Sequence, residues 1–376
     1  MSMRVTAAVF EKLYTPFSVA EVELDPPGPG EVLVRIVATG VCHTDAITRD
    51  GDLPFPPPGV LGHEGAGIVA EVGDGVTSVA AGDKVVIGWP WCGQCRNCLE
   101  GQPRYCLSLG QLVAGGSRPD GSTALRRLDG STLHSHFFGQ SSFATYSLCA
   151  ASSLVRVPAD APIEILGPLA CGIGTGAGAV LNALRPGVGS SVVVYGAGAV
   201  GLAAVMAARL TGATTIVAVD RLAARLRLAR ELGATETIDV SAAGADPVAA
   251  VREICGGPAD FSLECTGVID VVRQAADSVG MRGTCALIGG APAGASFSLD
   301  HMSTLWGKRV IGTLGGEGRS VSLIGALIEL NKQGRFPYDK LVTPFPLESV
   351  NDALEASRAG DVIKPVLRMP DAGSSG

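Results

Sequence analysis

Charged residues make up only 17% of the 376 residues and aromatic residues only 5%, whereas hydrophobic residues reach 47%. No basic run is longer than two residues, as at Arg126–Arg127, and acidic residues outnumber basic ones by 36 to 29. Nucleic acid is therefore not an expected partner, because its binding needs a concentrated basic surface. The low charge also excludes a disordered chain, since enough apolar surface is available to form a packed core.

The sequence also lacks a segment typical of a membrane span or a secretory leader. The uncharged stretch from Ser190 to Ala208 is interrupted by glycines in a strand-then-helix pattern, which is typical of buried α/β core. The first residues carry charges at Arg4 and Glu11 and no apolar run before a cleavage site. We therefore expect a cytoplasmic protein without membrane contact, whose ten cysteines are metal ligands or buried thiols.

Two domains are expected from the length, and the sequence pattern changes near residue 172. Before that point, short Val/Ile-rich segments at 32–40, 66–73 and 83–88 predict strands of an antiparallel β domain. After it, strands at 191–196, 215–220, 260–265 and 284–290 alternate with helices. This alternation predicts a doubly wound parallel sheet, and the fold class is α/β. Two further helices are expected at 322–334 and 347–360, and the last residues, GSSG, are expected to form a tail.

A dinucleotide-binding fingerprint follows the strand at 191–196. Gly196, Gly198 and Gly201 form a G-x-G-x-x-G sequence that opens a helix, which suits a tight turn, close approach of a pyrophosphate and helix–strand packing. Asp220 ends the next strand, where a carboxylate accepts hydrogen bonds from the adenosine ribose. It favours NAD over NADP, although Arg221 beside it weakens this preference.

Four cysteines lie within fifteen residues on one predicted loop. Cys92, Cys95, Cys98 and Cys106 have the spacing C-x2-C-x2-C-x7-C. Four thiolates fill the coordination sphere of a tetrahedral zinc ion, which predicts a structural zinc site. An iron–sulfur cluster is the alternative, but the fourth cysteine lacks the usual x3-C-P context.

A second set of metal-binding residue types is dispersed along the first half of the chain. Cys42 lies in GVCHTD, His63 in GHEGAG and Cys171 in LACGIGTG. Each residue alone is typical of ordinary packing. If the three converge, two thiolates and one imidazole leave a fourth position of a zinc ion open.

Together these motifs resemble the zinc-dependent medium-chain alcohol dehydrogenase family, over nearly the whole chain. The most specific part is the zinc signature Gly62-His63-Glu64-x2-Gly67-x5-Gly73-x2-Val76. The resemblance implies a GroES-like antiparallel β catalytic domain at 1–172, completed by 314–376. It also implies a Rossmann-type NAD-binding domain with a doubly wound parallel sheet at 173–313.

The resemblance implies two zinc ions per subunit. Cys42, His63 and Cys171 would bind the catalytic ion, and the four clustered cysteines the structural one. Asp45 would orient His63, and Glu64 would approach the metal during ligand exchange. Without the family, Asp45 is equally well a turn residue and Glu64 a solvated charge.

The family's chemistry implies that zinc lowers the pKa of the alcohol and stabilises the alkoxide. The Thr44 hydroxyl would take the proton, and hydride would pass to the nicotinamide of NAD. Thr175 and Val200 would contact the nicotinamide, although ordinary packing explains both residues equally well. The predicted cofactor-binding residues are His43, Thr175, Gly196, Gly198, Val200, Gly201, Asp220, Arg221 and Arg225.

Two positions depart from the best-known members of the family. His43 stands where many members carry an arginine against the pyrophosphate, and Ile47 replaces the relay histidine. The isoleucine, with CHTD and the segment HFFGQSSFATY at 136–146, resembles the benzyl or aryl-alcohol dehydrogenase branch.

Trp89, Trp91 and Phe55 are expected to line an aromatic substrate pocket, and a hydrophobic wall or subunit contact is the alternative interpretation.

The predicted function is NAD-dependent oxidation of primary aromatic or allylic alcohols to aldehydes, in a reversible reaction. The alternatives are the S-hydroxymethylglutathione (formaldehyde) dehydrogenase branch and a non-catalytic dinucleotide-binding relative. The resemblance also implies a homodimer or homotetramer, associated through strands that include the segment 308–316. The expected partner is a small alcohol or aldehyde.

Overall fold

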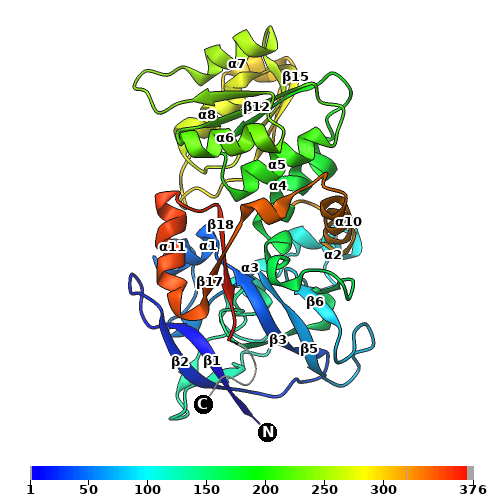
Figure 1. Cartoon of the computed structure of the whole chain (residues 1–376), viewed down its shortest axis with the longest axis vertical. Helices are drawn as coiled ribbons and strands as arrows, with labels where there is room; N and C mark the ends of the chain where they lie inside the picture. Colours follow the sequence, from blue (N-terminus) through cyan, green and yellow to red (C-terminus); the bar gives the residue numbers. More distant parts are fainter. Residues whose placement is uncertain (1, 319, 371–376) are drawn as a thin grey trace. The chain divides into compact units, whose positions relative to one another are not determined.

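The computed structural model describes residues 2–318 and 320–370, so the predicted GSSG tail lies outside the described residues. The chain forms two compact units (Figure 1). Of the described residues, the first unit contains 2–171, 320–328 and 339–370, and the second contains 172–318 and 329–338. No described helix is long and apolar enough to cross a membrane.

Two sheets, largely antiparallel, build the first unit. One has the strand order β4-β1-β2-β7-β8. Its strands are β1 (Met3–Phe10), β2 (Ser18–Leu24), β4 (Gly59–Val60), β7 (Leu125–Arg126) and β8 (Thr132–Leu133). The other has the order β10-β6-β5-β3-β18-β17, with β9 also paired to β3. Its strands are β3 (Glu31–Gly40), β5 (Gly65–Val72), β6 (Lys84–Ile87), β9 (Tyr146–Ala150), β10 (Leu154–Arg156), β17 (Val342–Pro346) and β18 (Lys364–Arg368).

Strand β3 organises the second of these sheets, because it pairs antiparallel with β5, β9 and β18. Alternation of buried Val and Ile side chains along this strand anchors a core that includes Val32, Val34 and Ile36. The strands expected at 32–40, 66–73 and 83–88 are confirmed as β3, β5 and β6. The helices of this unit are α1 (His43–Arg49), α2 (Arg96–Leu99), α3 (Leu109–Ala114) and α11 (Val350–Ala359).

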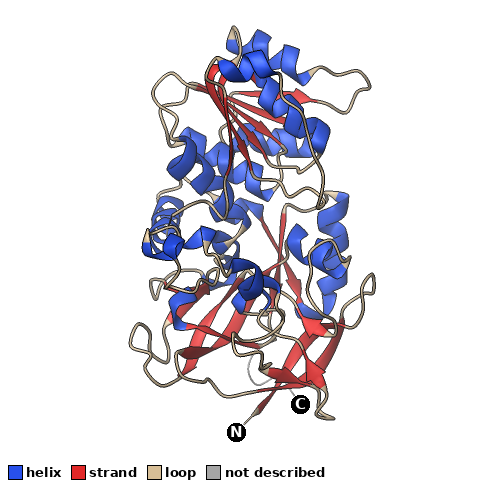
Figure 2. Cartoon of the chain, turned by 180° about the vertical axis from the view of Figure 1, so that it is seen from behind, coloured by secondary structure: helices blue, strands red, loops and turns tan. Residues whose placement is uncertain are grey.

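The second unit contains one parallel six-stranded sheet, with the order β13-β12-β11-β14-β15-β16. Its strands are β11 (Ser191–Tyr195), β12 (Thr215–Asp220), β13 (Glu236–Asp239), β14 (Ala259–Glu264), β15 (Val279–Leu287) and β16 (Arg309–Gly312). Helices flank the sheet (Figure 2). They are α5 (Ala199–Arg209), α6 (Ala223–Leu232), α7 (Pro247–Cys255), α8 (Ile269–Ser278) and α9 (His301–Leu305), and a further helix, α4 (Gly172–Gly178), packs against α5. The predicted alternation of strands and helices around a parallel sheet is thus confirmed.

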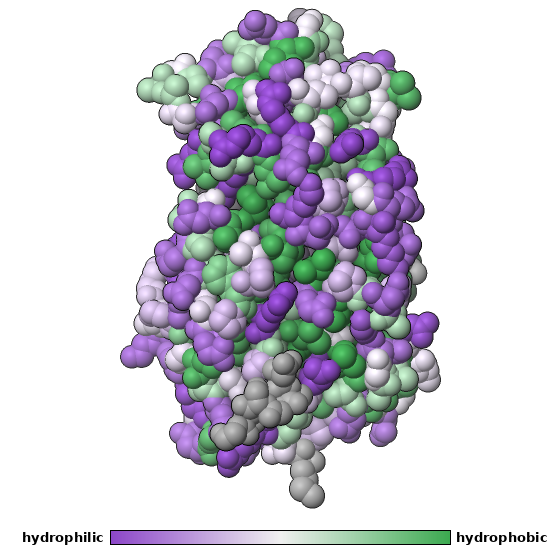
Figure 3. Space-filling view, in the orientation of Figure 1, coloured by the Kyte–Doolittle hydropathy of each residue, from purple (hydrophilic) through white to green (hydrophobic). Residues whose placement is uncertain are grey.

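The two helices expected near the C-terminus are present. Helix α10 spans Ser320–Lys332, and α11 ends at Gly360, whose φ of 84° places it in the left-handed region. Glycine adopts this conformation without strain, which explains the predicted stop. Hydrophilic side chains are interspersed with smaller apolar patches on the face drawn in Figure 3.

The division of the chain differs from the expected boundaries at 173–313. Residues 314–318 belong to the second unit, because Gly316 packs directly against the segment that follows α4. The Asn182 side chain donates a hydrogen bond to the Gly316 carbonyl at 2.9 Å. A Cβ atom at Gly178 would lie 1.9 Å from the same carbonyl oxygen. Residues 329–338 also join the second unit, which divides α10 between the two.

Candidate metal centres and cofactor site

The first unit brings together Cys42, His63, Glu64 and Cys171. One ligand atom from each of these residues lies within 4.8 Å of the others. His63 and Glu64 are fully buried, and Cys171 is 7% exposed. The three dispersed residues of the sequence therefore converge, and a carboxylate lies beside them.

The start of α1 positions three of the predicted catalytic residues, Cys42, Thr44 and Asp45. Cys42 precedes the helix with an extended backbone, and its N–H donates to Asp45 Oδ2 at 2.9 Å. The Thr44 hydroxyl lies 3.6 Å from the Cys42 sulfur. This capping arrangement fixes the direction of the Cys42 side chain and places a hydroxyl next to it.

A close approach of two backbones brings Cys171 to the same place. Gly167, in the short helix Gly167–Ala170, lies against the Glu64 backbone. A Cβ atom at Gly167 would lie only 1.9 Å from the Glu64 carbonyl oxygen. Glycine is thus required here, because any side chain would push the segment before Cys171 away from His63 and Glu64.

The His63 ring is oriented by a buried carboxylate. Its Nδ1 lies 3.0 Å from Asp45 Oδ1, and Asp45 is also fully buried. Burial lowers the pKa of His63, but the Asp45 charge and hydrogen bond outweigh it and raise that pKa well above its usual value. The buried Nε2 has no hydrogen-bond partner among the described residues. A buried imidazole nitrogen in this position is suited to a metal ion, with Asp45 on the opposite nitrogen.

A hydrogen bond between the two thiols shifts their pKa values in opposite directions. The hydrogen bond from Cys171 is the largest cause of a pKa of Cys42 well below that of an ordinary thiol. The same interaction raises the pKa of Cys171. A divalent cation would allow both sulfur atoms to be thiolates, so the donor set Cys42, Cys171 and His63 Nε2 fits zinc with one open position.

Lys364 is a site residue that the sequence reasoning missed. Its ammonium group donates to Glu64 Oε1 at 2.9 Å and to the Val41 carbonyl at 3.2 Å, and it is 3% exposed. Burial raises the pKa of Glu64, and Lys364 opposes this shift. The signal in the sequence is a lysine at the start of KPVLR, where the next three residues are apolar and buried in β18.

Gln140 is a second residue without a predicted role. Its amide donates to the His63 carbonyl, and its Oε1 accepts from the Gly65 N–H, both at 3.0 Å. The side chain is 2% exposed. It therefore fixes the backbone on both sides of Glu64.

Aromatic rings surround His63. Its ring centroid lies 4.7 Å from that of Phe138 and 5.5 Å from that of Phe137. Trp89 contacts Phe138, and Phe55 contacts Phe137. Two of the three aromatic residues expected to form one pocket thus belong to this cluster. Trp91 donates a hydrogen bond from its indole to the Ser152 carbonyl at 3.2 Å and lines a cavity together with Trp89, and its place in a substrate pocket stays a prediction.

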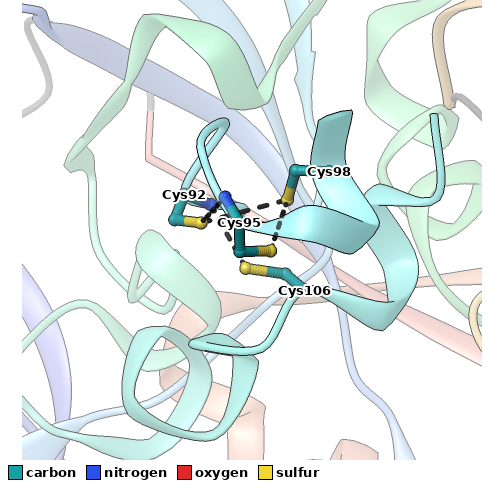
Figure 4. Close-up of side chains that lie close together, drawn as sticks. All are labelled: Cys92, Cys95, Cys98 and Cys106. Carbon is teal, nitrogen blue, oxygen red and sulfur yellow. Dashed lines mark hydrogen bonds between the residues drawn. The ribbon is translucent and has the colours of Figure 1, made fainter. Parts of the chain in front are cut away.

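The second cysteine cluster forms as the spacing predicts (Figure 4). The sulfur atoms of Cys92, Cys95, Cys98 and Cys106 all lie within 4.8 Å of one another. The Cys95–Cys98 sulfur distance is 3.4 Å. Backbone N–H groups of Leu107 and Cys98 lower the pKa of Cys95 to about 6. Four converging thiols with N–H donors to sulfur fit a closed zinc site.

The second unit holds the dinucleotide fingerprint. Gly196 makes the turn after β11 with a φ of 92°, and a Cβ atom at Gly201 would lie 1.8 Å from the Gly196 carbonyl. Gly198 precedes α5, and a Cβ atom there would meet nothing closer than the Arg225 guanidinium at 4.0 Å. Open space at a helix N-terminus, beside an arginine, fits the phosphates of a dinucleotide.

The other predicted cofactor-binding residues are Asp220, its neighbouring arginines, His43 and Thr175. Asp220 ends β12 and accepts hydrogen bonds from the N–H groups of Ala197 and Leu222, at 2.7 and 2.9 Å. Arg225 lies 4.0 Å from this carboxylate. Arg221 and His43 are exposed. Thr175 lies on α4, which packs against the start of α5 so closely that a Cβ atom at Gly176 would lie 2.0 Å from the Val200 carbonyl.

Glu264 supports this site and was not predicted. It ends β14, is fully buried, and accepts hydrogen bonds from the N–H and hydroxyl of Thr266 and from the Gly267 N–H. Its carboxylate holds Thr266 in place, and the Thr266 methyl group lies 2.6 Å from the position of a Cβ atom at Gly196. The sequence signal is an acid at the end of an apolar strand.

Residues 28–159 match the alcohol dehydrogenase GroES-like domain, and residues 199–330 match the zinc-binding dehydrogenase domain. The geraniol dehydrogenase of Castellaniella defragrans is 42% identical over 366 residues, which cover 96% of each chain. The chain belongs to the zinc-dependent medium-chain alcohol dehydrogenases.

Two other relatives of this alcohol dehydrogenase represent different branches. The crystal structure of benzyl alcohol dehydrogenase from Acinetobacter calcoaceticus has a TM-score of 0.94 and 42% identity, and covers 98% of this chain and 100% of that one. The S-(hydroxymethyl)glutathione dehydrogenase of Synechocystis is 36% identical over 97% of this chain and 100% of its own. The predicted family, the GroES-like and Rossmann-type fold, and the zinc and NAD cofactors typical of such an oxidoreductase are confirmed.

Proposed function

We propose that this alcohol dehydrogenase uses NAD to oxidise primary aromatic or allylic alcohols to aldehydes, reversibly. The observation that carries the proposal is the aromatic cluster around His63, formed by Phe137 and Phe138. Flat π surfaces beside the metal-binding side chains favour a planar, unsaturated group next to the alcohol carbon. The likeness to geraniol and benzyl alcohol dehydrogenases supports the same substrate class.

In the proposed mechanism, Cys42, His63 and Cys171 hold zinc, which as a Lewis acid would polarise the alcohol oxygen and lower its pKa. Asp45 keeps His63 in the tautomer that presents Nε2 to the metal. The Thr44 hydroxyl, next to Cys42, receives the alcohol proton. The Ile47 side chain has no group that can accept this proton from Thr44. The proton therefore leaves through water or the cofactor ribose, with His43 as a further acceptor.

The second unit's residues bind the cofactor in this proposal. The α5 N-terminus at Gly198 and Arg225 hold the pyrophosphate, and Asp220 accepts hydrogen bonds from the adenosine ribose. A carboxylate in this position repels a 2′-phosphate, which favours NAD over NADP. Arg221 moderates the preference, and Thr175 and Val200 contact the nicotinamide.

Two assignments about the whole protein belong to the same proposal. We expect association of two or more copies through the edge strand β16, because the neighbouring helix α9 exposes Met302, Leu305 and Trp306. Light scattering of the purified chain measures this directly. A cytoplasmic location follows from the six cysteines in the two clusters, which a reducing compartment keeps as thiols.

The test compares NAD reduction by the zinc-loaded enzyme with benzyl alcohol, an allylic terpene alcohol, ethanol and S-hydroxymethylglutathione. The proposal expects the highest kcat/KM for the first two substrates. The alternative is S-hydroxymethylglutathione oxidation, supported by the likeness to the Synechocystis enzyme. A strong preference for S-hydroxymethylglutathione would replace the aromatic and allylic assignment with this alternative.

A further inference from the structure

A cavity of about 140 Å³ lies beside the loop of the four-cysteine cluster. Its walls include Trp89, Trp91, Arg104, Ser153 and Leu154. An engineered cavity of roughly 150 Å³ with apolar walls holds one benzene molecule. The cavity therefore has the size of a single aromatic ring, and two indole rings are among its walls.

Two polar atoms of the lining residues are buried without a partner. The Trp89 Nε1 and the Ser153 hydroxyl make no hydrogen bond to any part of the chain that the structure describes. Ser153 is 4% exposed. Buried polar groups in native proteins are normally satisfied, so this pair indicates a missing partner such as a ligand or water. Both groups donate hydrogen bonds, and an indole N–H can only donate.

A positive charge belongs to the same wall. The Arg104 guanidinium carbon lies 5.0 Å from the centre of the Trp89 ring, within the range of a cation–π contact. Arg104 is 6% exposed. Two hydrogen-bond donors and a guanidinium select a group that accepts hydrogen bonds and carries negative charge, while the indoles and Leu154 select an aromatic ring.

We propose that this cavity is a second binding site, for a small aromatic carboxylate. The ring occupies the space between the indoles and Leu154, and the carboxylate binds Ser153 and Arg104. Trp89 also contacts Phe138 at a centroid distance of 5.0 Å, and Phe138 contacts the His63 ring. Occupation of the cavity is therefore expected to affect turnover through Trp89 without displacing the alcohol.

The experiment measures binding of 4-fluorobenzoate to the zinc- and NAD-loaded enzyme by fluorine NMR. Ser153→Ala is expected to weaken binding about fivefold or more, since it removes one hydrogen bond to a charged group. Leu154→Phe is expected to abolish binding because the larger ring fills the cavity. Ser131→Ala and Leu128→Phe, at exposed positions of the same unit, serve as matched controls and should bind as the unchanged protein does.

Two further measurements on the unchanged enzyme keep the proposal testable if a variant does not fold. Benzoate soaked into crystals is expected between Trp89 and Ser153, and its inhibition is expected to be noncompetitive with the alcohol. Benzoate found only at Cys42, His63 and Cys171, with competitive inhibition, would overturn the second site. Equally tight binding of toluene in the cavity would overturn the carboxylate specificity. Neither result bears on which alcohol the enzyme oxidises.

Discussion

The two cysteine clusters of the first unit differ in how their ligands are brought together. Cys92, Cys95, Cys98 and Cys106 lie on one loop, and the hydrogen bonds to their sulfur atoms come from backbone N–H groups of that loop. Cys42, His63 and Cys171 come from separate parts of the chain and depend on a buried network. The geometry of the four-cysteine cluster is thus fixed within one loop, whereas the geometry of the dispersed cluster depends on how distant parts of the chain pack together.

The chemistry differs in the same way. Four thiols occupy all positions of a tetrahedral zinc ion and suit a structural role, and two thiols with one imidazole leave a position open for substrate. Glu64 lies beside the cluster of Cys42, His63 and Cys171, and its Oε1 accepts a hydrogen bond from Lys364. The dispersed cluster is therefore supported by a side chain, Lys364, that is not one of the proposed metal ligands.

The largest difference is expected from removing one ligand of each cluster. Cys42→Ser should lower turnover more than about 100-fold, beyond the range seen when only a supporting partner of a metal ligand is lost. Its melting temperature should change little. Cys98→Ser should instead lower the melting temperature first, because a structural zinc site contributes directly to folding. Assays of turnover, zinc content and thermal unfolding on both variants check the division. A similar loss of melting temperature in the two variants would contradict it.

Breaking the buried ion pair between Lys364 and Glu64 should lower the free energy of unfolding, although the four-cysteine loop makes no use of this pair. Lys364→Met leaves the Glu64 carboxylate fully buried without its partner, and the free energy of unfolding should fall by about 3–5 kcal/mol. The double variant Glu64→Gln with Lys364→Met should recover most of this loss, because it buries no charge. Urea unfolding of the three proteins measures the effect. A single variant as stable as the parent would show that the ion pair does not support this site.

A smaller effect is expected at the residue that orients the histidine. Asp45→Asn keeps the size of the side chain but weakens its bond to His63 Nδ1. Zinc affinity or turnover should fall by about 10–100-fold, while the four-cysteine cluster keeps its zinc. Zinc titration with a competing chelator separates the two sites. The matched control is Asp25→Asn, which changes an aspartate of the same unit that pairs with Arg118 away from the metal-binding residues.

The same contrast explains what could be predicted from the sequence. The spacing of the four cysteines and the pattern around Gly196 are local, so each predicts its geometry directly. The meeting of Cys42, His63 and Cys171 requires the pairing of distant strands, which no local pattern encodes, and only the resemblance to a family supplied it. The sequence does not predict the supporting residues Lys364, Gln140 and Glu264. Each looks like an ordinary polar residue until its burial in the structure is known.

Anomalous X-ray diffraction at the zinc absorption edge, on crystals of the purified enzyme, tests directly whether both cysteine clusters bind zinc. Two zinc peaks per chain are expected. One should be bound by four sulfur atoms, and the other by the Cys42 and Cys171 sulfurs and His63 Nε2, with one position not occupied by these residues. A single peak at the four-cysteine loop in a fully active enzyme would show that Cys42, His63 and Cys171 do not hold a catalytic zinc ion.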